Sequence, residues 1–315
     1  ASKRGCGKEI PEQMVFMKTN LPPLYKYLDA EGAALTLDNR AFKHAKPSDF
    51  NDVEDLTIQS LFPEEIEDAL QILAGGFTDA ILRNLDKDPT CDSPRKEMLM
   101  VIQQAFRTNP DAAELAQADL MAGFDEMYDV EYYRNKATAY IAEINEFMQG
   151  FRVLCVSIYN DSEKMWAKYA QEHKGICLRI EPNIAKDSKF QLFRPVVYRE
   201  TRPPLYEDTL EFLEGGLFGN MEARTTECIE RIIYSKTLKW QQEGEYRLAC
   251  PIGENEKPWD TMPYHPEEIT EVYLGCEMEP QDVEDIVGKA LSVNADMEVY
   301  QAQPPSNGRI AFARL

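Results

Sequence analysis

The spacing of apolar residues changes twice along this chain of 315 residues, near residue 53 and again near residue 150. Outside these points, short apolar runs have the pattern of β-strands, whereas between them apolar residues recur every three or four positions, as in amphipathic helices. Strands scattered among helices without a regular β–α–β alternation favour the α+β class. The spacing therefore predicts an α+β fold with a mixed, twisted sheet, a central cleft and a large helical insertion.

The same pattern divides the chain into parts. Residues 1–20 have no periodicity and are expected to form an N-terminal arm. Residues 21–55 and 151–315 are expected to form the α+β core domain, and residues 56–150 the helical insertion. One long helical stretch is expected in the core at 209–238, with a break at Gly215-Gly216. Strands are expected at 24–28, 41–45, 152–157, 175–180, 193–198, 244–250, 269–274, 296–302 and 309–314.

The charge of the chain is strongly acidic and uneven. The formal net charge is −21, and residues 51–150 hold 21 Asp and Glu against 7 Lys and Arg. Such a surface repels phosphate backbones, which argues against broad nucleic-acid binding. An acidic run of this kind is typical of a solvated face. The alternative is that the helical insertion binds a basic protein partner.

Composition also bears on location and metal binding. No apolar run approaches the roughly 20 residues that span a bilayer, and no apolar segment follows the basic N-terminus as in a secretory signal. The seven cysteines are odd in number and form no CxxC pair, which is typical of free thiols in a reducing compartment. With three histidines and no His/Cys cluster, no metal site is predicted. We therefore expect a cytoplasmic protein that does not bind membranes.

The stretch from Lys236 to Ala249 holds the main candidate site. If residues 241–250 form one strand, then Glu243, Glu245 and Arg247 point to the same side. Three such groups are costly to bury against an apolar core, so they either line a solvated polar site or form an exposed face with a structural Glu–Arg pair. Paired carboxylates suit general acid–base catalysis or the stabilisation of a developing cation.

Four other residues have two interpretations each. Ser157 closes a buried strand, either as a site residue or as an ordinary turn residue. Trp166 and Tyr169 lie on one face of a predicted helix, where the rings pack against the sheet or stack on a planar ligand. Lys26 lies on a short strand between tyrosines, either as an edge residue or as an anchor for an anion.

Several short motifs occur in a characteristic order. They are Leu24-Tyr-Lys-Tyr, Lys46-Pro-Ser-Asp-Phe-Asn-Asp52, Val156-Ser157, Lys164-Met-Trp-Ala-Lys-Tyr-Ala170, Gly175-Ile-Cys-Leu, Val197-Tyr198, Lys236…Trp240…Glu243-Gly-Glu245-Tyr-Arg247 and Val272-Tyr-Leu-Gly275. In this order they resemble the bacterial domain-of-unknown-function family 2971, over about residues 24–60 and 151–290. That resemblance implies the fold more than an activity, because the family has no established one.

A second similarity is to the ADP-ribosyltransferase superfamily. Those enzymes place a basic residue on an early strand, a serine on a middle strand and Glu-x-Glu on a late strand, matched here by Lys26, Ser157 and Glu243-Gly-Glu245. The resemblance implies that Lys26 holds the pyrophosphate or ribose of NAD and that Ser157 positions Glu245. It further implies that Glu245 stabilises the ribosyl cation as nicotinamide leaves, while Glu243 orients or deprotonates the acceptor. Departures from the pattern are Lys in place of Arg or His, no Ser-Thr-Ser, and Arg247 close enough to neutralise Glu245.

Ten residues make up the predicted site. The predicted catalytic residues are Glu245, Glu243 and Ser157, and the predicted NAD-binding residues are Lys26, Asn51, Asp52, Trp166, Tyr169, Lys236 and Arg247. The leading hypothesis is an NAD-consuming transferase or NAD glycohydrolase, with this small-molecule nucleotide as substrate. The alternatives are another hydrolase that uses the paired glutamates and a non-catalytic protein-binding module that acts through the acidic helical insertion.

Overall fold

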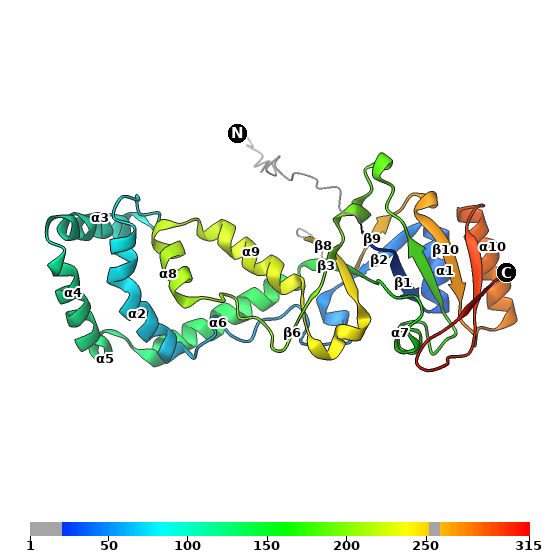
Figure 1. Cartoon of the computed structure of the whole chain (residues 1–315), viewed down its shortest axis with the longest axis horizontal. Helices are drawn as coiled ribbons and strands as arrows, with labels where there is room; N and C mark the ends of the chain where they lie inside the picture. Colours follow the sequence, from blue (N-terminus) through cyan, green and yellow to red (C-terminus); the bar gives the residue numbers. More distant parts are fainter. Residues whose placement is uncertain (1–20, 252–258) are drawn as a thin grey trace, which may run out of the picture. The chain divides into compact units, whose positions relative to one another are not determined.

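The computed structural model describes residues 21–251 and 259–315, which form two compact units (Figure 1). The first unit comprises residues up to 33, 160–193 and 265–315, and the second comprises residues 34–159 and 194–264. Helices and a mixed sheet together confirm the predicted α+β class. The predicted N-terminal arm lies outside the described residues. The central cleft and the boundaries of the helical insertion stay predictions.

The sheet of the first unit has the strand order β12-β11-β10-β4-β1. Its elements are β1 (Leu24–Leu28), α7 (Glu163–Tyr169), β4 (Ile176–Ile180), β10 (Ile269–Leu274), α10 (Pro280–Val293), β11 (Glu298–Ala302) and β12 (Phe312–Arg314). β10 and β11 are parallel, and the other neighbours in this order are antiparallel. The helix α1 (Ala30–Asn39) begins in this unit and ends in the second.

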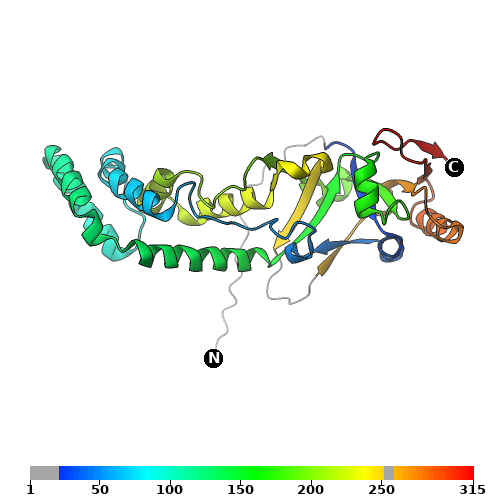
Figure 2. The same cartoon turned by 90° about the horizontal axis from the view of Figure 1, so that it is seen from below.

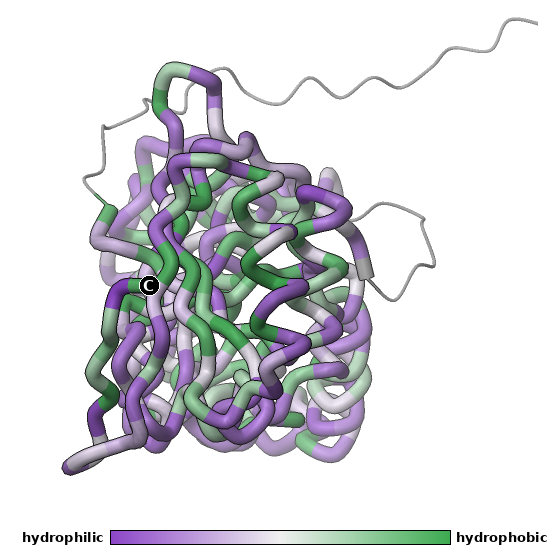
Figure 3. Tube along the Cα trace, turned by 90° about the vertical axis from the view of Figure 1, so that its right-hand side faces the viewer, coloured by the Kyte–Doolittle hydropathy of each residue, from purple (hydrophilic) through white to green (hydrophobic). Residues whose placement is uncertain are grey.

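Strand β4 lies at the centre of the first unit. Ile176, Cys177 and Leu178 are all fully buried, because β4 pairs with β1 on one side and β10 on the other and is covered on both faces. Trp166 of α7 packs edge-on against Tyr27 of β1, with ring centroids 5.5 Å apart. Figure 3, viewed from the side of this unit, shows green apolar stretches alternating with purple hydrophilic ones along the chain.

The second unit contains an antiparallel sheet and a small separate one. Its strands are β2 (Ala41–Ala45), β3 (Phe151–Ser157), β5 (Arg194–Pro195), β6 (Val197–Arg199), β7 (Ser235–Thr237), β8 (Glu245–Pro251) and β9 (Trp259–Pro263). β8 pairs with β3 and β5, while β2 pairs with β3 and β9. β6 and β7 form a parallel pair of their own. β9 was not predicted from the sequence.

Helices form the rest of the second unit. They are α2 (Ile66–Arg83), α3 (Ser93–Thr108), α4 (Asp111–Ala122), α5 (Phe124–Met127), α6 (Val130–Met148), α8 (Thr209–Phe218) and α9 (Met221–Ile233). Figure 2 shows the long helix α6, in green, running alongside α9, in yellow. The isoleucines of α9 recur at helical spacing and join Ile144 and Met148 of α6 in one apolar core. Val153 of β3 belongs to the same core, so the core joins these helices to the sheet.

The predicted break of the 209–238 helix at Gly215-Gly216 is wrong. Both glycines lie inside α8, and the chain leaves the helix at Gly219. The next helix starts there because the side chain of Asn220 accepts a hydrogen bond from the Ala223 N–H at 3.1 Å, which caps α9. The end of the predicted helix is instead strand β7.

None of the helices within residues 21–251 and 259–315 combines the length and apolar character needed to cross a bilayer. In the same residues, each of the six cysteines is a free thiol.

Candidate functional site

Five charged side chains meet in the interior of the second unit. We call them the ionic cluster, and they are Asp55, Lys236, Glu243, Glu245 and Arg247. They come from the turn after β2, from β7, from the 3-10 helix η4 (Leu238–Glu243) and from β8. All five side chains are almost completely removed from solvent. Burial makes their mutual pairing obligatory, because an unpaired buried charge is very costly.

The prediction of one strand through residues 241–250 is wrong at its start. Residue 243 ends η4, and the strand begins only at Glu245. Between them Gly244 adopts a left-handed conformation with φ of 50°, and a Cβ atom there would lie 2.6 Å from the ring of Tyr159. Glu243 and Glu245 therefore meet through a tight turn that requires glycine, and not through strand alternation.

Arg247 is the centre of the ionic cluster. Its Nε donates to Glu245 Oε1 at 2.7 Å, and its Nη2 donates to Asp55 Oδ2 at 2.5 Å. Nη1 donates to the carbonyl oxygen of Ile233 at 2.7 Å. The residue is 0% exposed. Since all three guanidinium nitrogens are engaged and enclosed, Arg247 serves as a positioning residue and is not placed to touch a ligand.

Lys236 joins the two glutamates. Its Nζ donates to Glu243 Oε2 at 2.6 Å and to Glu245 Oε2 at 2.7 Å. The ammonium also lies 5.1 Å from the centroid of the Trp240 ring, within cation–π range. One positive charge is thus held between two carboxylates and beside an aromatic ring.

The pKa values follow from burial and from this pairing. Burial raises the pKa of Glu245, but Arg247 and Lys236 more than offset it, so the pKa lies far below its ordinary range. Burial lowers the pKa of Lys236, and the nearby carboxylates of Glu245 and Glu243 reverse this and raise it. Glu245 is therefore a permanent anion, and Lys236 a permanent cation, near neutral pH.

Asp55 carries the surplus charge of the ionic cluster, which has three carboxylates and two cations. Burial raises the pKa of Asp55, and the attraction of Arg247 does not fully cancel this effect. Repulsion from Glu245 acts in the same direction as burial. Asp55 thus takes up a proton more readily than Glu245.

Ser157 and the predicted catalytic glutamates do come together. Ser157 is the last residue of β3 and lies directly opposite Glu245 in the antiparallel pairing with β8. Its hydroxyl donates to the carbonyl oxygen of Glu243 at 2.7 Å and accepts from the Tyr159 N–H at 3.0 Å. The Glu245 N–H donates to the Tyr198 hydroxyl at 2.8 Å. The turn that carries both glutamates is therefore fixed from two sides.

Asp52 forms a second polar group next to the ionic cluster. It accepts a hydrogen bond from Trp240 Nε1 at 2.7 Å and pairs with Arg202 at 3.2 Å. Burial raises the pKa of Asp52, but Trp240, Arg202 and Lys239 outweigh it, so the pKa is lowered. The neighbouring Asn51 is exposed.

The remaining predicted residues belong to the first unit. Lys26 lies on β1, opposite Leu178 of β4. Trp166 is 0% exposed, and its Nε1 donates to the carbonyl oxygen of Asn160 at 2.6 Å, so it is a core residue in the structure. Tyr169 is half-buried, with Lys168 over its ring at 4.9 Å.

Sequence reasoning missed Asp55, Tyr198 and Trp240 as members of the site. Asp55 had a signal in its position, three residues after the predicted site residue Asp52. In the structure the Asp55 N–H donates to the Asp52 carbonyl oxygen at 2.9 Å. Tyr198 and Trp240 had a weaker signal as members of the ordered motifs. Among the residues that the structure describes, no group of three or more His, Cys, Asp or Glu is arranged to hold a metal ion.

The pairing of Glu245 predicts a specific response to acid. Its pKa is lower in the folded than in the unfolded chain, so it contributes stability that is present above its unfolded pKa of about 4.3 and lost as pH falls through the folded value. Asp55 has the opposite sign, because its raised pKa favours the folded state as it binds a proton. We expect the wild type to have a higher unfolding free energy than Glu245→Gln at pH 7 and at pH 5.

Below pH about 4.3 that difference should shrink. The measurement is urea unfolding at pH 7, 5, 4 and 3. Glu114→Gln, at an exposed position of α4, is the matched control and should follow the wild type at every pH. A gap between wild type and Glu245→Gln that persists unchanged to pH 3 would show that the pKa of Glu245 is not depressed.

Comparison with known proteins gives one match. Residues 165–248 match a family described as a protein of unknown function (DUF2971), a span that includes the first half of β8 and four of the five residues of the ionic cluster. No curated protein and no solved structure matches the chain.

Proposed function

We propose that the chain is an NAD-consuming enzyme, a transferase or NAD glycohydrolase, that works at Glu243 and Glu245. The observation that carries the proposal is the single ammonium of Lys236, held at 2.6 and 2.7 Å between these two carboxylates. Two carboxylates that hold one cation have the electrostatic character needed to stabilise a ribosyl cation. Ser157 supports the same assignment, because it fixes the backbone of the turn that carries them.

Lys236 occupies the place where the substrate cation would lie. The nicotinamide ribosyl group of NAD is itself positively charged, so it is chemically suited to replace the ammonium between Glu243 and Glu245. The lysine side chain is long and flexible, and it can leave without any change in the strands. In this proposal the described arrangement is the resting state, with Lys236 neutralising the site until NAD binds.

The chemical step follows from the charges. The bond between ribose C1′ and the pyridinium nitrogen breaks, and its electron pair leaves with neutral nicotinamide. Glu245 remains ionised and stabilises the positive charge that develops on C1′. The oxygen of water or another acceptor then forms a bond to C1′, and Glu243 takes the proton released by that oxygen. Arg247 and Ser157 hold the two carboxylates in position.

The lowered pKa of Glu245 argues against a hydrolase in which Glu245 is the general base. A general base works best with a pKa near the operating pH, which for a glutamate near neutrality requires a raised pKa. Glu245 has the opposite shift. An anion that never titrates near neutrality is suited to stabilise a cation rather than to transfer protons.

A second candidate function is a non-catalytic protein-binding module. The observation in its favour is the burial of the ionic cluster, since Glu245 is 5% exposed and Arg247 is 0% exposed. In this alternative the cluster fixes the fold, and the acidic helices of residues 56–150 bind a basic partner. The two candidates differ in whether NAD binds.

NAD is expected to raise the unfolding free energy of the wild-type chain by about 2.7 kcal/mol at one hundred times its Kd. The same sample should release nicotinamide, measured by chromatography. NADH is the matched control, because its reduced ring is uncharged and is not a leaving group, and it should stabilise less and release nothing. Absence of both stabilisation and release with NAD would remove the proposal. A shift produced by a divalent metal would favour the hydrolase, and a partner captured through residues 56–150 would favour the binding module.

A further inference from the structure

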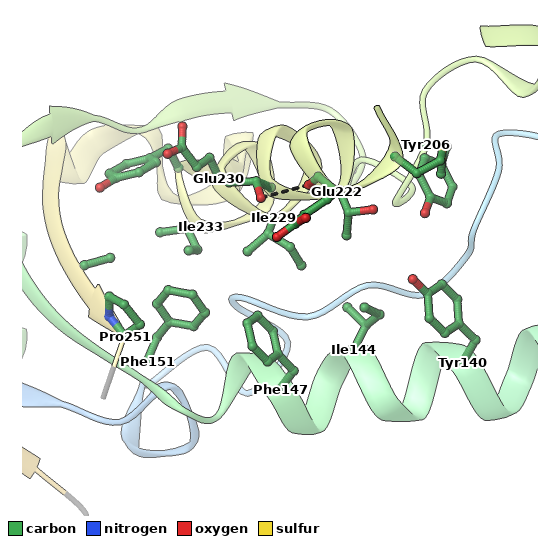
Figure 4. Close-up of a pocket in the computed structure, with 15 residues that line it drawn as sticks. Tyr140, Ile144, Phe147, Phe151, Tyr206, Glu222, Ile229, Glu230, Ile233 and Pro251 are labelled. Atoms are coloured by element: carbon green, nitrogen blue, oxygen red, sulfur yellow. Dashed lines mark hydrogen bonds between the residues drawn. The ribbon is translucent and has the colours of Figure 1, made fainter. Parts of the chain in front are cut away.

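A second site lies in the helical part of the second unit. A cavity of about 790 Å³ opens between α6 and α9 and reaches the end of strand β8 (Figure 4). Its volume lies within the roughly 300–1,000 Å³ that small-molecule sites occupy. The cavity does not include any residue of the ionic cluster, so a ligand bound in it does not depend on the proposed NAD chemistry.

The wall of the cavity is apolar and partly aromatic. Residues from α6, β3, α9 and β8 contribute to it, among them Ile144, Phe147, Phe151, Ile229, Ile233 and Pro251. Phe147 is 57% exposed at the opening, although its ring packs edge-on against Phe151 with centroids 5.6 Å apart. A ligand that covers this half-exposed aromatic ring removes its apolar surface from water, which contributes favourable binding free energy.

Polar groups lie at one end and on one side. Figure 4 shows Tyr140 and Tyr206 facing each other at one end, so their hydroxyl groups make that end polar. Glu222 and Glu230 lie on α9 along the other wall. The carboxylate of Glu230 is neutralised by Arg194 at 2.9 Å. Within residues 21–251 and 259–315, Glu222 has no ion-pair partner, so it leaves a negative charge at the rim.

We propose that this cavity binds a cationic amphiphile, a small molecule with an alkyl or aryl body and an ammonium group. The apolar wall accepts the body, and Glu222 attracts the positive group. The net charge of −21 acts in the same direction, since it attracts cations and repels anions such as fatty acids. Together these features select the sign of the ligand's charge as well as its apolar character.

The test compares three ligands that share one chain and differ in charge: decyltrimethylammonium, decanol and decanoate, all below micelle formation. Binding is measured by displacement of the neutral dye N-phenyl-1-naphthylamine from the full chain. We expect decyltrimethylammonium to bind tightest and decanoate weakest. Glu222→Gln should weaken binding of the cation by about two- to fivefold, as for a solvent-exposed ion pair, and leave decanol unchanged.

Two further variants change the cavity itself. Phe147→Ala removes an exposed ring of the wall, and Thr226→Trp fills the opening from a solvent-exposed position of α9, so neither disturbs the core. Both variants should weaken the binding of all three ligands. Tyr132→Ala, an exposed aromatic of α6 outside the cavity, and Glu114→Gln are the matched controls and should change nothing. No binding of any ligand, equal affinity for cation and anion, or binding that survives Thr226→Trp would overturn the proposal.

Discussion

Replacing Arg247 with leucine is expected to lower the free energy of unfolding by about 3–5 kcal/mol, the usual cost of removing one partner of a buried ion pair. The substitution removes the guanidinium that Asp55 and Glu245 share, at a position that is 0% exposed in the wild type. It also changes the charge of the ionic cluster from three carboxylates and two cations to three carboxylates and one. The measurement is equilibrium unfolding in urea at pH 7.

The matched control is Arg83→Leu. Arg83 also lies 2.5 Å from a carboxylate oxygen, that of Glu214, but its side chain is 52% exposed. An exposed pair is worth about 0.2–1 kcal/mol, so the control should lose little. A triple variant, Asp55→Asn, Glu245→Gln and Arg247→Leu, neutralises three of the five members. It should recover part of the lost stability, because the two remaining charges, Lys236 and Glu243, still pair with each other. Equal losses for the Arg247 and Arg83 variants would contradict the role given to burial.

Replacing Glu245 with glutamine is expected to slow nicotinamide release by about 10²–10³, or about 3–4 kcal/mol, if the proposed function holds. Glutamine keeps the shape and most hydrogen bonds but removes the charge that meets the developing cation. The variant should still fold, because it leaves two carboxylates to balance the two cations of the ionic cluster. Its loss of stability should therefore be smaller than that of Arg247→Leu.

Glu243→Gln should separate the two activities. It should impair transfer to an acceptor more than simple hydrolysis of NAD, because water needs less orientation than a larger acceptor. Nicotinamide release and thermal unfolding are measured for each variant, with Glu114→Gln as the control for a change of surface charge. Release by Glu245→Gln at the wild-type rate would remove the transferase assignment. If Glu245→Gln lowers Tm by several degrees and the wild type releases no nicotinamide, the ionic cluster has a structural role.

The local pattern of the sequence was enough for most of the elements. Strand β1 at Leu24–Leu28 and strand β2 at Ala41–Ala45 lie where alternation predicted them, because a strand's pattern is set by neighbours two residues apart. The long helices between residues 66 and 148 follow their apolar spacing in the same way. The predicted break at Gly215-Gly216 failed because neighbouring residues of α8 pack into apolar clusters, Phe212 in one and Leu217 and Phe218 in another, which outweighs the weak helix propensity of glycine.

The order of the motifs predicted that Ser157 lies beside Glu245. The antiparallel pairing of β3 with β8 places the two residues opposite each other. The burial of these charged groups depended on tertiary structure alone. The sequence placed Glu243, Glu245 and Arg247 close together, but the turn at Gly244 and the approach of Asp55 and Lys236 decided that they would be buried and mutually neutralised. Burial depends on what the rest of the chain brings over a side chain, and that includes residues nearly two hundred positions away. For the same reason, sequence order could suggest Lys26, Trp166 and Tyr169 as site residues, while only the fold assigned them to a different compact unit from Glu245.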